Sequence, residues 1–269
     1  MKFERNEWES EFFGREIYSL IFDEHNQILP PLAGEVVEHS ETEGGKFVKF
    51  YGNSTACSPL PPASQGTSPA SGGRIGNPIL IQTKIPTTDL NKLVFLQQHG
   101  FQLVETEITF SLDIANFSEN LTACNVRIAT EQDLPSLKNL VATAFRNTRF
   151  REPYFSQAEN QRFYQQWIEN AAKGEFDDFC LIAEQQEELQ GAISLRFLGD
   201  KAKIGLLAVS PEFQRQGIGK GLLFATIWQA KSQHAKSLEI TTQLSNIPAI
   251  QLYQSLSAKI TEMNYWFYQ

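Results

Sequence analysis

Three glycines at alternate positions, Gly217, Gly219 and Gly221, mark the stretch of this sequence whose pattern most clearly suggests chemistry. They follow a short apolar run, IGLLAV, and a polar turn, and they lead into an amphipathic segment, so a strand, a loop and a helix are predicted. Unpaired N–H groups and the dipole at the start of a helix attract anions, and glycines let the backbone approach a phosphate closely. The pattern therefore favours a pyrophosphate site, although an ordinary strand–turn–helix junction would explain the glycines equally well.

Two common phosphate-binding loops do not describe this stretch. Its glycines lack the G-x-G-x-x-G spacing of a dinucleotide-binding turn, and no G-K-[ST] ending marks a P-loop. The remaining interpretation is a helix N-terminus that points out of a glycine-lined turn.

A second group with binding potential is a cluster of arginines. Four of the chain's ten arginines fall within seventeen residues of an acidic protein: Arg146, Arg149, Arg151 and Arg162. Guanidinium groups bind diphosphates through paired hydrogen bonds. Nearby aromatic rings could stack on a base or a sugar: Tyr154, Phe155 and Tyr164. We interpret these residues as ligand contacts; the alternative is a solvated helix edge with its aromatic residues in the core.

The composition limits the class of protein. The 269 residues carry a net charge of −8, with a pI of about 5.2, so no general basic field attracts nucleic acid or an anionic membrane. The three cysteines are far apart and lack metal-ligand spacing, and none of the four histidines has a recognisable catalytic context. We therefore expect a cytoplasmic protein with free thiols, no metal, no signal peptide and no membrane-spanning segment.

The first part of the chain, residues 1–119, is predicted to form a smaller α+β domain. Strands are expected at 16–22, 46–52, 79–85 and 101–114, and a helix at 89–100. Residues 53–78 contain five Ser, five Pro and four Gly. Such a composition buries too little apolar surface to become ordered, so we expect a flexible insert.

The second part, residues 123–269, is predicted to form a separate α/β domain. Strands are expected at 125–130, 179–185, 189–198, 204–209, 237–243 and 258–268, and helices at 131–145, 158–174, 219–233 and 247–256. Thr130 and Asp133 have the spacing of a capping box at the first of these helices. This order of elements is typical of a mixed sheet flanked by helices.

The loop resembles motif A of the GNAT superfamily of N-acetyltransferases. Gln214–Gly219 fits the pattern [RQ]-x-x-G-x-[GA] after a strand and a proline turn, and an Asn and a helix with a Tyr follow the next strand. The resemblance implies a GNAT fold with a mainly antiparallel mixed sheet, and acetyl-CoA as co-substrate. It implies pyrophosphate contacts from the loop: Gln214, Arg215, Gln216, Gly217, Ile218, Gly219 and Lys220. The main chain of Leu207, Ala208 and Val209 would orient the thioester, and Asn246 would lie beside the pantetheine arm.

A longer resemblance suggests the acceptor. Residues 148–182 look like the RFR-x-P…RFY-x-QWIEN…G-x-FD segment of bacterial dTDP-fucosamine acetyltransferases, and the likeness continues in WESEFFG, LQQHGFQLVETEI and the terminal YWFYQ. It covers most of the chain outside residues 53–78. Two departures, a full motif A and Ser257 where the family has a glycine, suggest a relative that uses a different amino sugar.

The same resemblances assign the chemistry. Acetyl transfer needs a neutral amine, stabilisation of an oxyanion and a proton for the departing thiolate. Tyr253 corresponds to the superfamily's proton donor, and an N–H near Val209 to its oxyanion donor. Glu105 corresponds to the family's candidate base. A core tyrosine and a surface glutamate are the alternatives at these two positions.

The sequence thus predicts a cytoplasmic N-acetyltransferase that acts on the 4-amino group of a dTDP-linked 4-amino-4,6-dideoxyhexose in surface-polysaccharide synthesis. One alternative is a GNAT enzyme that acetylates a protein N-terminus or a small amine. Another is a regulatory module that binds acetyl-CoA without turnover. The resemblance also hints at a homodimer.

Overall fold

The computed structural model describes residues 1–22, 79–115, 117, 125–146 and 148–269. The predicted strand at 46–52, the predicted insert at 53–78 and two of the three cysteines, Cys57 and Cys124, lie outside the described residues. The third, Cys180, is a free thiol buried in the core. The described residues belong to one compact unit.

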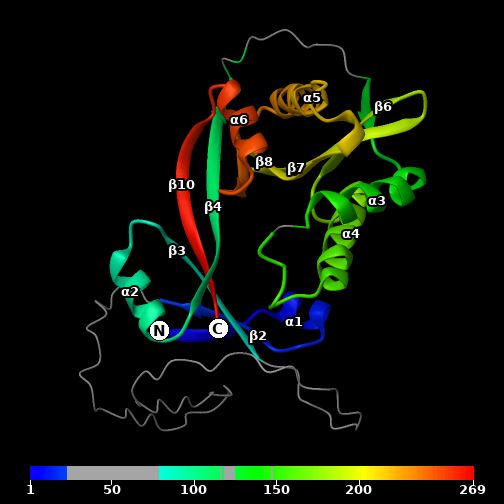
Figure 1. Cartoon of the computed structure of the whole chain (residues 1–269). Helices are drawn as coiled ribbons and strands as arrows, with labels where there is room; N and C mark the ends of the chain where they lie inside the picture. The colour runs from blue at the N-terminus through cyan, green and yellow to red at the C-terminus, as the bar shows by residue number, and fades with distance from the viewer. Residues whose placement is uncertain (23–78, 116, 118–124, 147) are drawn as a thin grey trace, which may run out of the picture. The chain divides into compact units, whose positions relative to one another are not determined.

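The described strands form one ten-stranded sheet in the order β1-β2-β3-β10-β4-β9-β8-β7-β6-β5 (Figure 1). They are β1 (Lys2–Arg5), β2 (Ile17–Ile21), β3 (Leu80–Pro86), β4 (Gln102–Asp113), β5 (Val126–Ile128), β6 (Phe179–Gln185), β7 (Glu188–Leu198), β8 (Lys201–Val209), β9 (Ser237–Gln243) and β10 (Lys259–Tyr268). Within this described sheet only β2–β3 and β8–β9 pair in parallel. The predicted mixed, mainly antiparallel sheet is confirmed.

Helices cover both faces of this sheet. They are α1 (Glu7–Phe13), α2 (Leu90–Gln98), α3 (Leu134–Ala144), α4 (Gln157–Lys173), α5 (Ile218–Ser232) and α6 (Ile247–Ser255), with 3-10 turns at Glu131–Asp133 and Pro211–Phe213. The predicted capping box of Thr130 and Asp133 is present at the first of these turns, which leads into α3. A second box, Ser156 with Glu159, starts α4 and was not predicted.

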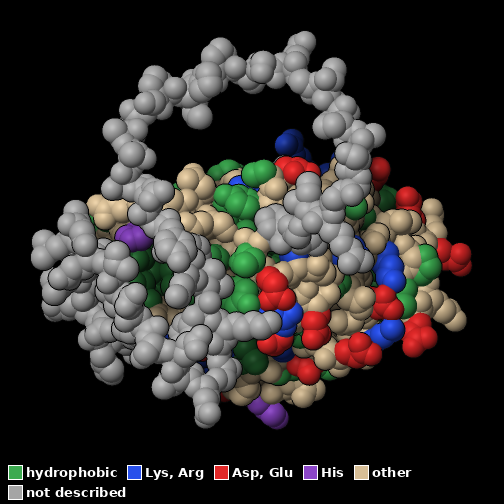
Figure 2. Space-filling model, turned by 90° about the horizontal axis from the view of Figure 1, so that it is seen from below, with side chains coloured by type: hydrophobic (Ala, Val, Ile, Leu, Met, Phe, Trp, Pro, Cys, Tyr) green, Lys and Arg blue, Asp and Glu red, His purple; other side chains and the backbone are tan. Residues whose placement is uncertain are grey.

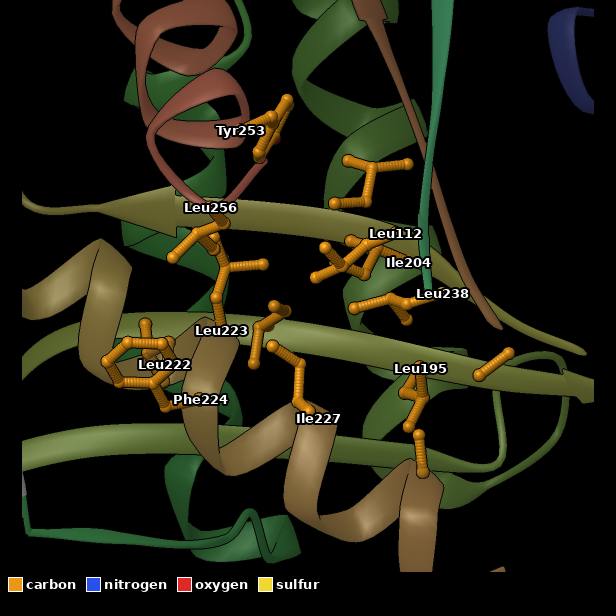
Figure 3. Packing of buried hydrophobic residues seen from close by; sticks show 14 of the residues in the cluster. Leu112, Leu195, Ile204, Leu222, Leu223, Phe224, Ile227, Leu238, Tyr253 and Leu256 are labelled. Carbon is orange, nitrogen blue, oxygen red and sulfur yellow. The ribbon is translucent and has the colours of Figure 1, made fainter. Parts of the chain in front are cut away.

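Strand β8 contributes to two hydrophobic clusters because its side chains alternate between the faces of the sheet. Leu207 and Val209 pack in the cluster that α5 covers, whereas Leu206 and Ala208 pack in the cluster that α3 and α4 cover. Figure 3 shows Leu223 and Ile227 of α5 pointing toward the strands of the first cluster. The sheet therefore separates an α5–α6 face from an α3–α4 face (Figure 1).

The C-terminal strand joins the two predicted domains. β10 lies between β3 and β4, so strands from residues 1–119 and 123–269 share one sheet. β1 and α1 are not among the predicted elements. The division into two domains stays a prediction.

The charges on the surface and the lengths of the helices bear on which partners the protein can have. Figure 2 shows acidic and basic side chains interspersed on the described part of one face. In the part of the chain that the structure describes, no helix is both long and apolar enough to cross a bilayer. Nor do three or more metal-ligating side chains gather anywhere among the described residues.

Candidate active site

The candidate site lies where two parallel strands separate. β8 and β9 pair only over Lys201–Ile204 and Ser237–Ile240. Beyond this point β8 continues along β7 as far as Val209, while β9 continues along β4 as far as Gln243. The second half of β8 therefore has one edge without a strand partner in the described sheet. We call this opening the β8–β9 wedge.

The main chain of β8 offers hydrogen-bond donors to the wedge. The N–H of Ser210 donates to the carbonyl of Gln190 in β7 over 2.9 Å. Because hydrogen-bonded positions alternate along an antiparallel ladder, Ala208 also faces β7, and the N–H groups of Leu207 and Val209 face the wedge. Leu207 and Val209 thus direct main-chain N–H groups toward the wedge, whereas Ala208 does not.

The glycine loop sits at the end of the same strand. Residues 214–217 are exposed, Gly217 is the N-cap of α5 with φ +85°, and Arg215 also has a positive φ of 61°. The first bond of the helix runs from the N–H of Gly221 to the carbonyl of Gly217. Helix geometry leaves the preceding N–H groups outside the helical ladder. A Cβ on Gly219 would lie 3.3 Å from Leu252, so the space over this turn is narrow.

These features fit an anionic group such as the pyrophosphate of acetyl-CoA. The exposed turn, the helix N-terminus and the absence of a Cβ at Gly217 and Gly219 allow close approach of a phosphate. Three polar side chains of the loop contact neighbouring residues of the chain. Gln214 contacts the Val209 carbonyl at 3.4 Å, Gln216 donates to Glu212, and the Lys220 ammonium lies 5.1 Å from the Phe224 ring. Ile218 is buried against the core.

Tyr253 lies on the α5–α6 face. It is buried, and its ring packs edge-on against Phe110 of β4 with centroids 5.6 Å apart; Figure 3 shows Tyr253 on α6 above the strands. Burial raises its pKa above the ordinary phenol value, so the hydroxyl is protonated at neutral pH. It makes no hydrogen bond to the described part of the chain. A protonated phenol with no internal acceptor can donate its proton to a ligand.

Asn246 fixes the helix that carries this tyrosine. Its side-chain oxygen accepts from the N–H of Ala249, and its amide donates to Thr242 in β9 over 3.2 Å. Asn246 therefore caps α6 and ties it to β9. Its predicted place beside the pantetheine arm stays a prediction.

Two glutamates lie on the opposite face of β4. Glu105 accepts a hydrogen bond from Arg151 over 3.0 Å, and its side chain is only 10% exposed. Glu107 accepts from the indole of Trp266 over 3.1 Å and pairs with Lys84 at 3.0 Å. Glu107 and Trp266 are not among the site residues predicted from the sequence. The two-residue spacing of the glutamates, which puts both on one strand face, was the available signal.

Strand register places Glu107 beside the β8–β9 wedge. Phe110, Ile240 and Ile204 are aligned across β4, β9 and β8. Three residues farther along β4, Glu107 lies opposite Gln243, the last residue of β9, at the border of the wedge. Tyr253 packs on the other face of β4, so a buried phenol and two carboxylates lie on opposite faces of the sheet near the wedge.

The arginine cluster divides into internal and exposed members. Arg149 donates to Glu9 at 2.8 Å, to Gln82 at 2.9 Å and to the hydroxyl of Tyr268 at 2.6 Å. Its guanidinium lies 4.0 and 4.1 Å from the rings of Phe150 and Trp266. The sequence predicts ligand contacts for Arg149, but the structure gives it an internal role, because three protein acceptors and two aromatic rings already surround its guanidinium.

Two of the predicted stacking rings are also internal. Phe155 and Tyr164 are 1% and 5% exposed within the cluster under α3 and α4. The expectation that they contact a ligand is therefore corrected: neither ring has a free face at the surface. Burial raises the pKa of Tyr164 to about 12.

The remaining members of the cluster stay candidates. Arg151 is 40% exposed, although it also donates to the carbonyls of Thr148 and Val104. Tyr154 is half-buried against Tyr268, and two further arginines are exposed: Arg146 and Arg162, the latter bonded to the Phe12 carbonyl. Arg151 is the member that joins the loop before α4 to β4.

The chain is similar to known acetyltransferases. Residues 135–257 match the model of the acetyltransferase (GNAT) family. The chain is 36% identical over 191 residues to a dTDP-fucosamine acetyltransferase of Escherichia coli O6:H1, a match that covers 70% of this chain and 81% of that protein. It is 27% identical to the spore coat polysaccharide biosynthesis protein SpsD of Bacillus subtilis over 51% of this chain, and spans about half of that relative, 47%.

Solved structures agree on the fold. A GCN5-related N-acetyltransferase from Sphaerobacter thermophilus superimposes with a TM-score of 0.54 at 14% identity, over 71% of this chain and 59% of that one. At this identity the likeness concerns the architecture alone, and the chain spans less than two thirds of that structure.

Proposed function

The chain belongs to the GNAT family of acetyltransferases, and from that premise we propose that it acetylates the 4-amino group of a dTDP-linked 4-amino-4,6-dideoxyhexose. Acetyl-CoA is the co-substrate of the family, and the chain is an acetyl-CoA-dependent N-acetyltransferase. The observation that carries the choice of acceptor is the 36% identity to a dTDP-fucosamine acetyltransferase across 81% of that protein. The resemblance to a polysaccharide biosynthesis protein supports a role in surface-polysaccharide synthesis. We place the reaction in the cytoplasm, and the homodimer stays a prediction.

The proposed reaction uses the two faces of the wedge. The neutral amine nitrogen attacks the thioester carbonyl carbon, a C–N bond forms, and the C–S bond breaks. N–H groups of Leu207 or Val209 stabilise the negative charge on the carbonyl oxygen. Tyr253 donates its proton to the departing sulfur, and Glu105 accepts the proton that the amine loses, directly or through a water. Solvent then returns a proton to Tyr253.

Charge on the α3–α4 face supports an acceptor that carries both an amine and phosphates. Glu107 lies opposite Gln243 at the border of the wedge, Glu105 is two residues farther along β4, and such carboxylates attract a basic nitrogen. Arg151 stands beside them with 40% of its side chain exposed, and its guanidinium can accommodate a phosphate oxygen. We propose Arg151, Tyr154, Arg146 and Arg162 as the acceptor contacts. A purely cationic polyamine has no anionic group that the Arg151 guanidinium could bind.

Thiol release from acetyl-CoA tests the proposal. The purified chain is incubated with dTDP-linked 4-amino-4,6-dideoxyhexoses, with polyamines and with peptides that have free N-termini; Tyr253→Phe serves as the matched control. We expect turnover with a dTDP-amino sugar only. Turnover confined to polyamines or peptides would replace the acceptor. Binding of acetyl-CoA without turnover of any amine would favour the regulatory module.

A further inference from the structure

A buried carboxylate outside the reacting groups lies behind strand β8. Asp177, on the turn between α4 and β6, is 1% exposed. One of its oxygens accepts from the indole of Trp167 over 3.1 Å and from the hydroxyl of Ser194 over 2.6 Å. Its other oxygen has no hydrogen-bond partner among the described residues, and no described lysine or arginine pairs with it. Burying a carboxylate with no paired cation and one unbonded oxygen costs free energy. The fold keeps Asp177 in this place, so we ask what its hydrogen bonds hold.

Hydrogen bonds connect Asp177, through Ser194, to a β-bulge between β7 and β8. Between the pairs Ile193–Leu207 and Leu195–Ile204, strand β7 advances two residues while β8 advances three. The extra residue interrupts the ladder. The N–H of Leu206 finds its acceptor in the hydroxyl of Ser194 over 2.9 Å. The Ser194 hydroxyl in turn donates a hydrogen bond to Asp177, so a chain of hydrogen bonds runs from the carboxylate to the bulge.

Gly205 shows how closely the carboxylate and the bulge fit. A Cβ at this position would lie 2.2 Å from the bonded oxygen of Asp177 and 2.6 Å from the Ser194 hydroxyl. No side chain fits such a space. The close approach is thus built into the strand by a glycine.

The bulge has a consequence for the wedge. It begins immediately after Ile204, the last residue of β8 that pairs with β9. Because of the extra residue, Ile204 and Leu207 pack on the same face although three positions separate them. The bulge therefore sets which main-chain N–H groups of β8 point into the wedge.

We propose that Asp177 is a positioning residue for acetyl-CoA, acting through Ser194 to hold the bulge that aims the main chain of Leu207 and Val209. The inference rests on the proposed use of β8, not on the identity of the acceptor. Asp177 does not touch the reacting atoms. Its contribution is the geometry of the strand that does.

Calorimetric titration with acetyl-CoA, without any acceptor, tests this role. Ser194→Ala leaves the Leu206 N–H without an acceptor, and we expect the Kd to rise about tenfold. The matched control is Thr83→Val in β3, which likewise removes a buried, hydrogen-bonded hydroxyl; that of Thr83 donates to the Leu20 carbonyl over 2.8 Å. It should lower Tm to a similar extent and leave the Kd within about twofold of wild type. Equal Kd values in the two variants would overturn the proposal.

A second pair of variants separates position from charge. In Asp177→Asn the amide oxygen can accept the same two hydrogen bonds, so we expect near wild-type affinity, whereas Asp177→Ala should match Ser194→Ala. Equal losses in Asp177→Asn and Asp177→Ala would show that the charge matters and would overturn positioning by hydrogen bonds. If Asp177→Ala does not fold, the pair Ser194→Ala and Thr83→Val decides. The titration contains acetyl-CoA but no acceptor amine. Its result therefore does not depend on whether the protein acetylates an amino sugar, and the two proposals can fail separately.

Discussion

Arg149→Ala distinguishes an internal ion pair from a ligand contact. Arg149 bonds Glu9 of α1, Gln82 of β3 and Tyr268 of β10, so one guanidinium joins the N-terminal elements to the end of the C-terminal strand. The Glu9 residue is 6% exposed. Removing the guanidinium would leave this carboxylate buried without its cation. We therefore expect a loss of stability rather than a loss of acceptor affinity.

The magnitude follows from the contacts that remain. Breaking a buried pair by removing one partner costs about 3–5 kcal/mol. Glu9 would keep two donors, the Asn6 amide at 3.0 Å and the Gln82 amide at 2.5 Å, which places the expected loss at the lower end. A loss of about 3 kcal/mol corresponds to a decrease in Tm of roughly 6–12 °C for a chain of this size.

Thermal and urea unfolding measure this loss. Arg162→Ala is the matched control, because Arg162 is exposed and donates only to the Phe12 carbonyl in the described structure; it should cost less than about 1 kcal/mol. Adding Glu9→Gln to Arg149→Ala removes the unpaired charge. The double variant should regain part of the stability, with a coupling energy of about 1–3 kcal/mol.

One result would refute the reasoning. If Arg149→Ala unfolds at the temperature of wild type and instead raises the KM of the acceptor, the guanidinium binds a ligand. The internal network would then be incidental, and the original expectation from the arginine cluster would hold.

Three further predictions concern the proton donor, the loop and acid stability. Tyr253→Phe keeps the ring against Phe110 and removes only the hydroxyl, so turnover should fall by about 10²-fold with Tm unchanged. If turnover is unchanged while the chemical step limits the rate, Tyr253 is not the acid. Since burial raises the Tyr253 pKa, the wild-type rate should not decline with pH below about pH 10. Gly219→Val should weaken acetyl-CoA binding, because the Cβ would lie 3.3 Å from Leu252 and the methyl groups would enter the space over the loop. If calorimetry gives the same acetyl-CoA Kd for this variant and wild type, the pyrophosphate binds elsewhere. Hydrogen bonds from Lys138 and Lys173 lower the pKa of Glu169 from 4.5 to about 2, so this group stabilises the fold above pH 4.5 and its contribution is lost as the pH falls toward 2. The unfolding free energies of wild type and Glu169→Gln should differ by about 0.2–1 kcal/mol at pH 7 and converge in acid; a gap that widens in acid would contradict this sign.

The sequence by itself determined the parts of the site that consecutive residues build. A strand, a glycine-lined turn and a helix N-terminus are local structures, so Gly217, Gly219 and the strand before them could be read from their order. The periodicity of apolar residues likewise predicted most helices and strands, and the mixed sheet that contains them. The resemblance of whole segments then indicated acetyl transfer.

The tertiary structure alone decided which side chains meet. Arg149 becomes internal only because residues 9, 82 and 268 converge on it, and Glu105 acquires Arg151 as a partner from a loop 46 positions away. The bulge that aims Leu207 depends on Asp177 and Ser194 from two other elements. Spacing along a chain fixes the face on which a residue lies, but its burial and its partners depend on strand order, and strand order is set by packing between distant segments.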